Sequence, residues 1–254
     1  MSRPQYVIEH MEEDDPSAPS VFPHWALLEY RHMLHHVGPG STVHFTSLSH
    51  ASLESLRTSL SSTSSEPRAE FQLHTASITT LMAERNVPHA KVCLLDPKSP
   101  FAVSITDAGL VSSSTKSVEA GGPFEYFLFG GILGDDPPRD RTSSLRQLGF
   151  PSRHLGSIQM TTDTALGVTK RCVEDLLLLD LSDTQQQEKQ WGDADAAKGK
   201  MHWVDHPELK FGRGESVEMP FRYLVDERRG QGEPLMPEGM RELIRDDLGR
   251  SFEF

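Results

Sequence analysis

The sequence predicts an α/β fold in which helices flank a mainly parallel sheet. Short apolar segments of strand type alternate with longer segments of helical periodicity. The segment 91–97 holds a continuous apolar run, which is typical of a parallel strand buried on both faces. The strand-type segment 124–129 runs directly into a loop rich in glycine and charge. An open α/β sheet binds its ligand at such a place.

The first half of the chain supplies the sheet and two helices. Residues 24–37 are expected to form an amphipathic helix, because apolar residues recur every three or four positions until 38–40, Gly-Pro-Gly, ends it. A weaker helix is expected over 75–86, and Cys93 is expected in the core. The expected strands are 5–11, 43–48, 91–97 and 124–129.

The second half is expected to close the sheet and add a small β-rich C-terminal extension. A short helix over 141–148 and a short strand over 152–156 lead into a long helix that starts near Asp163. The apolar stripe expected on this helix is Ala165, Val168, Cys172, Leu176 and Leu179. Two β-type segments, 202–211 and 217–225, precede a last helix that starts at Pro237.

Length and composition indicate a single domain over 1–254. Three polar segments, 49–70, 104–122 and 182–200, are expected to be mobile insertions, because they are rich in serine, glycine or glutamine. Cys93 and Cys172, the two cysteines, lack the spacing of a disulfide framework or a zinc knuckle. No apolar run approaches the about 20 residues of a membrane helix. A cytoplasmic protein without a membrane partner is therefore expected.

The charge balance is acidic, with 25 basic and 37 acidic residues and a formal net charge of −12. Broad binding to nucleic-acid phosphates usually needs a basic surface, so nucleic acid is not the expected partner. A basic peptide or protein suits this charge better.

The loop after 124–129 is not a nucleotide-phosphate motif. Residues 130–134 are followed by neither the Lys-Ser/Thr of a P-loop nor the glycine spacing of a dinucleotide fingerprint. This favours a cofactor without phosphates, and S-adenosylmethionine (SAM) fits, because backbone groups can read its adenine and a carboxylate can face its sulfonium.

Five ordered segments carry a family resemblance. The strongest reads Phe129-Gly130-Gly131-Ile132-Leu133-Gly134-Asp135, followed by Pro137-Pro138-Arg139-Asp140-Arg141-Thr142. The others are 6–13, 92–97, 155–165 and 218–223, in the family's order along nearly the whole chain. Together they resemble the trefoil-knotted SPOUT-class methyltransferases, in particular the yeast-type protein-arginine methyltransferases that act on a small-subunit ribosomal protein.

The resemblance implies a C-terminal trefoil knot, SAM as cofactor and a monomer that monomethylates an arginine of a small-subunit ribosomal protein. It places the cofactor in a cleft made by three loops. In this sequence the corresponding residues are Phe129, Gly130, Gly131, Ile132, Leu133, Gly134, Leu155, Gly156, Gln159, Met160, Thr161, Thr162, Met219 and Pro220.

Methylation of arginine requires carboxylates, because the guanidinium stays protonated with a pKa above about 12. Acids at the strand ends can bind it, align one nitrogen and help to accept the leaving proton. The candidate catalytic acids are Glu9, Asp135 and Asp140, with Glu12 and Glu13 as substrate-binding acids. For Asp140, a salt bridge to Arg139 or Arg141 is an equally good interpretation.

No metal site is expected. Neither His-Glu-x-x-His nor Cys-x-x-Cys occurs, and His32, His35 and His36 are expected on the surface of the helix over 24–37. Arg222 is expected to have a structural role. Two other functions stay open: an RNA methyltransferase of the SPOUT class, and a non-catalytic ribosome-associated binding module.

Overall fold

The computed structural model describes residues 3–11, 14, 18, 21–61, 67–111, 121–131, 142–179, 196–212, 214–230 and 232–251. No helix within these ranges is long and apolar enough to cross a membrane.

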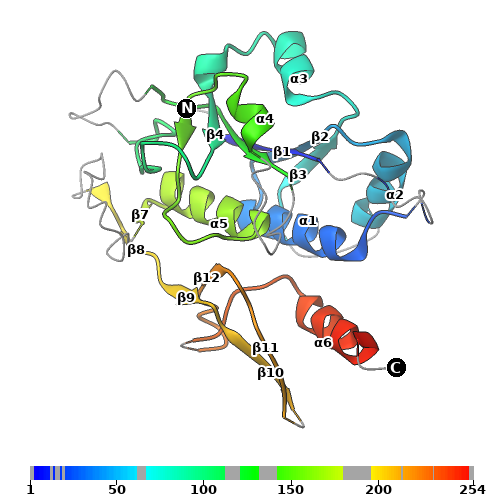
Figure 1. Cartoon of the computed structure of the whole chain (residues 1–254). Coiled ribbons are helices and arrows are strands. Elements are labelled where there is room, and N and C mark those ends of the chain that lie inside the picture. Colours follow the sequence, from blue (N-terminus) through cyan, green and yellow to red (C-terminus); the bar gives the residue numbers. More distant parts are fainter. Residues whose placement is uncertain are drawn as a thin grey trace.

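A six-stranded sheet, parallel throughout, organises the chain in the order β3-β2-β1-β5-β4-β6 (Figure 1). From β1, the chain adds β2 and then β3 on one side, and the later strands β4, β5 and β6 lie on the other side. The strand order therefore reverses between β1 and β5, and an open α/β sheet binds its ligand at such a point. The strands are β1 (Gln5–Glu9), β2 (Thr42–Thr46), β3 (Glu70–Leu73), β4 (Val92–Leu95), β5 (Tyr126–Gly130) and β6 (Ser152–Arg153).

Helices cover both faces of the sheet, as the uninterrupted apolar strands predict. Tyr6 and Ile8 of β1 pack on the layer of α1 (His24–Val37), α2 (His50–Ser61) and α5 (Thr162–Val173). Val7, between them, packs on the layer of α3 (Ile78–Arg85) and α4 (Ser143–Arg146). Cys93 is buried in the first layer, which confirms its expected core position.

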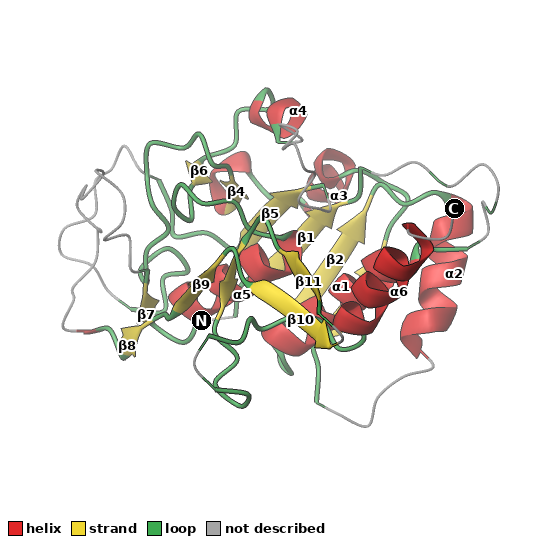
Figure 2. Ribbon diagram, turned by 60° about the horizontal axis from the view of Figure 1, so that its bottom comes forward, coloured by secondary structure: helices red, strands yellow, loops and turns green. Residues whose placement is uncertain are grey.

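The C-terminal extension is β-rich, as expected, and lies on the side of the sheet covered by α1 and α5 (Figure 2). Its α6 contacts α1, and its β12 contacts α5. Its elements are β9 (Trp203–Asp205) paired with β12 (Arg222–Leu224), β10 (Glu208–Gly212) paired with β11 (Glu215–Glu218), and α6 (Met240–Ser251). The short elements η1 (His89–Lys91), β7 (Leu177–Leu178) and β8 (Gly199–Lys200) complete the described structure.

Two of the three segments expected as insertions contain packed structure. Within 49–70, residues 50–61 form α2, whose Leu53, Leu56 and Leu60 are buried in the core. Within 104–122, Ile105 and Asp107 are almost fully buried. Most of the third segment, 182–195, lies outside the described residues.

The long helix expected after Asp163 is also shorter than its apolar stripe suggests. It ends at Val173, because the backbone of Leu176 turns to a φ of 61° and Leu177 starts β7.

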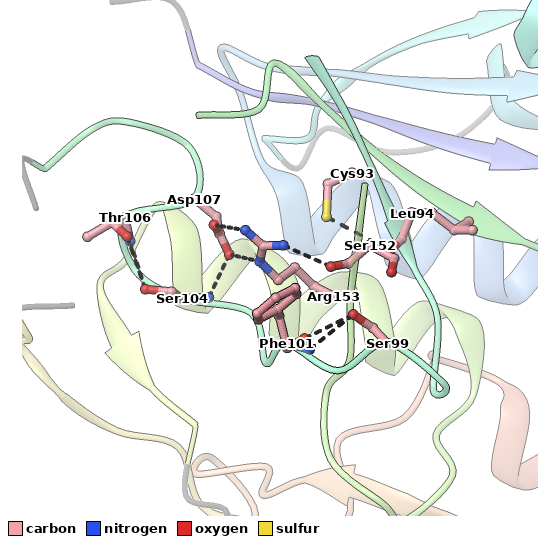
Figure 3. Close-up of polar contacts among 9 residues, drawn as sticks. All are labelled: Cys93, Leu94, Ser99, Phe101, Ser104, Thr106, Asp107, Ser152 and Arg153. Atoms are coloured by element: carbon pink, nitrogen blue, oxygen red, sulfur yellow. Dashed lines mark hydrogen bonds and ion pairs between the residues drawn. The ribbon is translucent and has the colours of Figure 1, made fainter. Parts of the chain in front are cut away.

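A buried ion pair holds the loop after β4 against β6. The guanidinium of Arg153 donates to both carboxylate oxygens of Asp107, at 2.9 and 3.0 Å (Figure 3). It also lies over the rings of Phe101 and Phe124, at 5.7 and 4.9 Å from the centroids. Both charged side chains are at most 3% exposed, so removing one charge leaves the other uncompensated in the core.

Asp107→Asn should therefore lower the free energy of unfolding by about 3–5 kcal/mol, measured by urea denaturation. The matched control is Glu125→Gln, which breaks the exposed Lys91–Glu125 pair at 3.0 Å and should cost below about 1 kcal/mol. Equal effects of the two substitutions would contradict the importance of the buried pair.

A buried histidine at the end of β1 makes stability depend on pH. His10 packs against Phe22 and Tyr30, and its Nδ1 is 2.9 Å from the hydroxyl oxygen of Tyr30. Burial lowers the pKa of His10 from 6.5 to about 4, although the nearby Asp14 carboxylate opposes this shift. The unfolded chain therefore binds a proton that the folded chain resists, and stability falls as the pH drops from 6.5 toward 4.

Between pH 7 and pH 5, His10 alone should cost about 2 kcal/mol of stability. His10→Gln should reduce the loss of stability between these two pH values by that amount, measured by urea denaturation at each pH. His24→Gln, at an exposed histidine of α1, should leave the pH dependence as it is. An unchanged pH dependence in His10→Gln would show that His10 has the same pKa in the folded and unfolded chains.

Candidate active site at the carboxyl edge of the sheet

Glu9, the last residue of β1, is held rigidly at the carboxyl edge of the sheet. Its Oε2 accepts hydrogen bonds from the Thr46 hydroxyl at 2.5 Å and from the Ile78 backbone N–H at 2.9 Å. Its Oε1 accepts one from the Ser47 hydroxyl at 2.5 Å. Ile78 is the first residue of α3, whose positive end favours a carboxylate. A carboxylate has about four acceptor positions, so Glu9 keeps acceptor capacity for a further donor.

Two glycines follow at the end of the neighbouring strand. Gly130 pairs with Glu9 in the sheet register, and the N–H of Gly131 donates to the Glu9 carbonyl at 3.1 Å. A Cβ on Gly130 would lie 2.9 Å from Leu145 Cδ1, so this position must stay small for α4 to pack. Gly131 has a φ of 72°, which favours glycine and turns the chain away from the sheet.

The segments expected to form the cofactor cleft meet in space. The Thr162 hydroxyl donates to the Gly131 carbonyl at 3.1 Å, which joins the loop after β5 to the start of α5. The Arg222 N–H donates to the Gln159 carbonyl at 2.8 Å, which joins the extension to the same segment. Hydrogen bonds therefore join three stretches that are distant in sequence, and the first of them bonds the backbone of Glu9.

Of the residues predicted to bind the cofactor, Gly131, Gln159 and Thr162 take part in these bonds, while Ile132, Leu133 and Gly134 lie outside the described residues. The Phe129 side chain is buried in the core, so only its backbone can face a cofactor. The individual roles stay predictions. The described members are Phe129, Gly130, Gly131, Leu155, Gly156, Gln159, Met160, Thr161, Thr162, Met219 and Pro220.

The segment between β6 and α5 is shaped by local bonds. Gly156 has a φ of 112° and donates its N–H to His154 Nδ1 at 3.1 Å. Thr161 stands at the N-cap position of α5, but its hydroxyl donates to the Thr164 hydroxyl at 2.9 Å rather than capping the backbone. The backbone groups at the start of α5 are therefore not capped by this side chain.

Arg222 has the structural role expected from the sequence. Its guanidinium donates to both carboxylate oxygens of Asp205, at 2.5 and 2.7 Å, and lies 5.1 Å from the ring centroid of Trp203. Hydrogen bonds from Arg222 hold the pKa of Asp205 below its ordinary value, although partial burial opposes the shift. The sequence did not single out Asp205 or Trp203, because only the antiparallel register of β9 and β12 brings them to this arginine.

The other predicted acids cannot be placed. Glu12, Glu13, Asp135 and Asp140 lie outside the described residues. Thr46 and Ser47, which orient Glu9, were missed by the sequence analysis. Their signal is that they lie near the end of the strand expected over 43–48, which the structure pairs with β1.

The donor set of the converging segments suits SAM. It consists of backbone groups and hydroxyls, and the guanidinium of Arg222 is already paired with Asp205. No cationic side chain among the described cofactor candidates is available for a phosphate. A cofactor that carries a sulfonium, and that backbone groups recognise, fits this chemistry.

Comparison with known proteins identifies the family. A family model described as "Protein arginine N-methyltransferase SFM1-like" matches residues 5–251. The chain is 33% identical over 261 residues to protein arginine N-methyltransferase SFM1 of Saccharomyces cerevisiae, covering 98% of both chains. The crystal structure of the yeast enzyme complexed with SAM is 31% identical, with a TM-score of 0.68, and covers 97% of this chain and 92% of that one.

A second crystal structure of the yeast enzyme, complexed with SAH, has 31% identity and a TM-score of 0.66 and covers 94% of each chain. These matches confirm the α/β fold and the family resemblance, whereas the trefoil knot stays a prediction. With the family model spanning almost the whole chain, the protein belongs to the SFM1-like protein arginine N-methyltransferases.

Proposed function

We propose that this chain transfers a methyl group from SAM to an arginine nitrogen of a basic protein, and that its substrate is a small-subunit ribosomal protein. One observation carries the proposal: hydrogen bonds join the three predicted cofactor segments to one another at the carboxyl edge of the sheet, where the first of them bonds the backbone carbonyl of Glu9. Its support is membership of the family and the crystal structure of the yeast relative with SAM.

The cofactor supplies an activated methyl group when it is bound. The residues that would hold it are the backbone groups of 129–131, 155–162 and 219–220, together with Ile132, Leu133 and Gly134. These residues belong to segments tied together by the bonds of Gly131 to Thr162 and of Gln159 to Arg222. Because those bonds fix the segments before a ligand arrives, less ordering is needed on binding.

The acids position the substrate in this proposal. Glu9 accepts a hydrogen bond from the guanidinium, and the bonds from Thr46, Ser47 and Ile78 keep its carboxylate in one orientation. Asp135 or Asp140 provides the second carboxylate, while Glu12 and Glu13 attract the basic substrate. Methyl transfer is a direct displacement at the methyl carbon, and the attacking arginine nitrogen must lie in line with the bond that breaks. Positioning therefore accounts for most of the rate.

The formal net charge of −12 supports a basic protein as the substrate. A ribosomal substrate implies a cytoplasmic enzyme. We extend the proposal to a monomer, since the chain's own extension covers α1 and α5.

Incubation with methyl-labelled SAM and unmethylated ribosomal fractions tests the function, with protein and RNA separated afterwards. The proposal expects label in one small-subunit protein, recovered as monomethylarginine after hydrolysis. Label in RNA alone would overturn it in favour of an RNA methyltransferase. No transfer, together with no binding of SAM, would indicate a binding module.

Gly131→Ala should weaken SAM binding at least tenfold, measured by calorimetry. A side chain at a φ of 72° strains the backbone by about 1–2 kcal/mol and moves the loop that faces the cofactor. Gly149→Ala is the matched control, because Gly149 has a φ of 77° with open space around it. It carries the same strain away from the site and should keep the wild-type affinity. Equal SAM affinities in both variants would show that the loop after β5 does not contact the cofactor.

Glu9→Gln should lower the rate of methyl transfer while leaving SAM affinity unchanged. Loss of a carboxylate that pairs with a desolvated cation costs about 2–5 kcal/mol, or roughly a thirtyfold to several-thousandfold drop in rate. Glutamine preserves the shape, since its carbonyl can accept from Ile78 and its amide can donate to the rotatable hydroxyl of Ser47. Single-turnover kinetics measures the rate of methyl transfer, and calorimetry measures the affinity for SAM. A wild-type rate in Glu9→Gln would show that Glu9 does not bind the substrate guanidinium.

A further inference from the structure

The seam between α1 and α5 holds a polar cluster of residues that are not among the predicted cofactor residues, although Asp163 directly follows Thr162. His32 and His36 lie one helical turn apart on α1, with ring centroids 4.1 Å apart. His32 Nδ1 is 2.6 Å from Asp163 Oδ2, on α5. A Cβ on Gly167 of α5 would lie 2.9 Å from the His36 ring, so this glycine leaves the space that the histidine fills. The two histidines are thus partly buried against α5, contrary to the surface position expected from the sequence, whereas His35 is exposed.

The geometry of this cluster matches a metal-ligand set. Ligand atoms of His32, His36 and Asp163 all lie within 4.8 Å of one another. Ligands of a tetrahedral zinc ion with bonds of about 2.0 Å are about 3.3 Å apart, which is of the same order as the spacing of these atoms. Two imidazoles and a carboxylate, without a thiolate, are ligands that zinc accepts.

Unpartnered carboxylate oxygens point to the same conclusion independently. Asp163 Oδ1 and Glu29 Oε2 are buried and lack a hydrogen-bond partner among the described residues. Their residues are only 1% and 3% exposed. A buried polar atom without a partner is costly, and a buried carboxylate is much more so. Glu29 stands one turn before His32 on α1 and interacts electrostatically with Asp163.

We propose that His32, His36 and Asp163 bind a divalent transition-metal ion of the zinc type, and that Glu29 supplies a fourth ligand. Binding through His32 Nδ1 replaces its hydrogen bond to Asp163, and the proton of the neutral ring then lies on Nε2. The ion joins α1 to α5 one residue after Thr162, which holds the loop of Gly131. It is structural, because none of its ligands belongs to the predicted cofactor residues.

The competing occupant is a proton. Burial and the Asp163 carboxylate raise the pKa of Glu29. In the competing case, a proton shared by the carboxylates of Glu29 and Asp163 takes the place of the metal ion. The two cases differ in stoichiometric metal binding and in the response of the histidine rings.

The test uses the full chain, stripped with EDTA and titrated with ZnCl₂ and with Co²⁺ as a spectroscopic probe. The proposal expects one ion per chain and the visible absorption of tetrahedral Co²⁺. At zinc a hundredfold above its dissociation constant, the stabilisation is about 2.7 kcal/mol. This should raise the Tm of a chain of this size by about 5–10 °C.

His36→Gln should abolish the zinc-dependent Tm shift, while His35→Gln, at the exposed histidine of the same helix, should retain it. SAM affinity should stay unchanged in both variants. Imidazole NMR spectra of the wild-type chain should show zinc shifting two rings only, which decides the question even if His36→Gln does not fold. No stoichiometric ion in the stripped wild-type chain, or equal shifts in both variants, would overturn the site.

Discussion

The parallel pairing of β1 with both β2 and β5 is the constraint on which the rest of the structure depends. It brings Glu9, Thr46 and Gly130 to one edge of the sheet in fixed register. The hydroxyl of Thr46 can then reach the Glu9 carboxylate, and the Gly131 N–H can reach the Glu9 carbonyl. A shift of one residue in either pairing would turn these side chains to the opposite face. The chemistry of the site therefore rests on the register of buried apolar strands.

The C-terminal extension is bonded to the segment that precedes α5. The backbone of Arg222 binds Gln159, and its buried side chain binds Asp205 and stacks on Trp203. A loss of this ion pair would free the third cofactor segment as well as the extension. The same extension packs on α1 and α5, whose seam holds His32, His36 and Asp163. The helix α5 thus starts at the segment that is bonded to Gly131 and continues into the core.

The sequence predicts five of the six strands of the sheet, because continuous apolar runs such as 92–95 admit few other interpretations, but it misses β3 at the edge, whose residues are exposed or half-buried. The helix α2 was not predicted, because its many serines suggest an insertion although three leucines recur at intervals of three and four residues. The helix α5 was predicted too long, because the left-handed backbone of Leu176 interrupts the apolar stripe. The candidate site is predicted in part, since Glu9, the glycines and the segment before α5 are brought together. The bond of Glu9 to Ile78 joins residues 69 positions apart, so local pattern cannot reveal it. His36 of α1 packs against α5 because Gly167 leaves space for its ring, and the sequence pattern does not reveal this contact.

A crystal structure of this chain with SAM tests the central claim most directly, which is that three segments distant in sequence form one cofactor cleft beside Glu9. The account predicts SAM against the backbone of Gly131, the segment 155–162 and the segment 219–222, with its methyl group directed toward the Glu9 carboxylate. SAM bound away from the carboxyl edge of β1 and β5, or with its methyl group facing away from Glu9, would contradict the account.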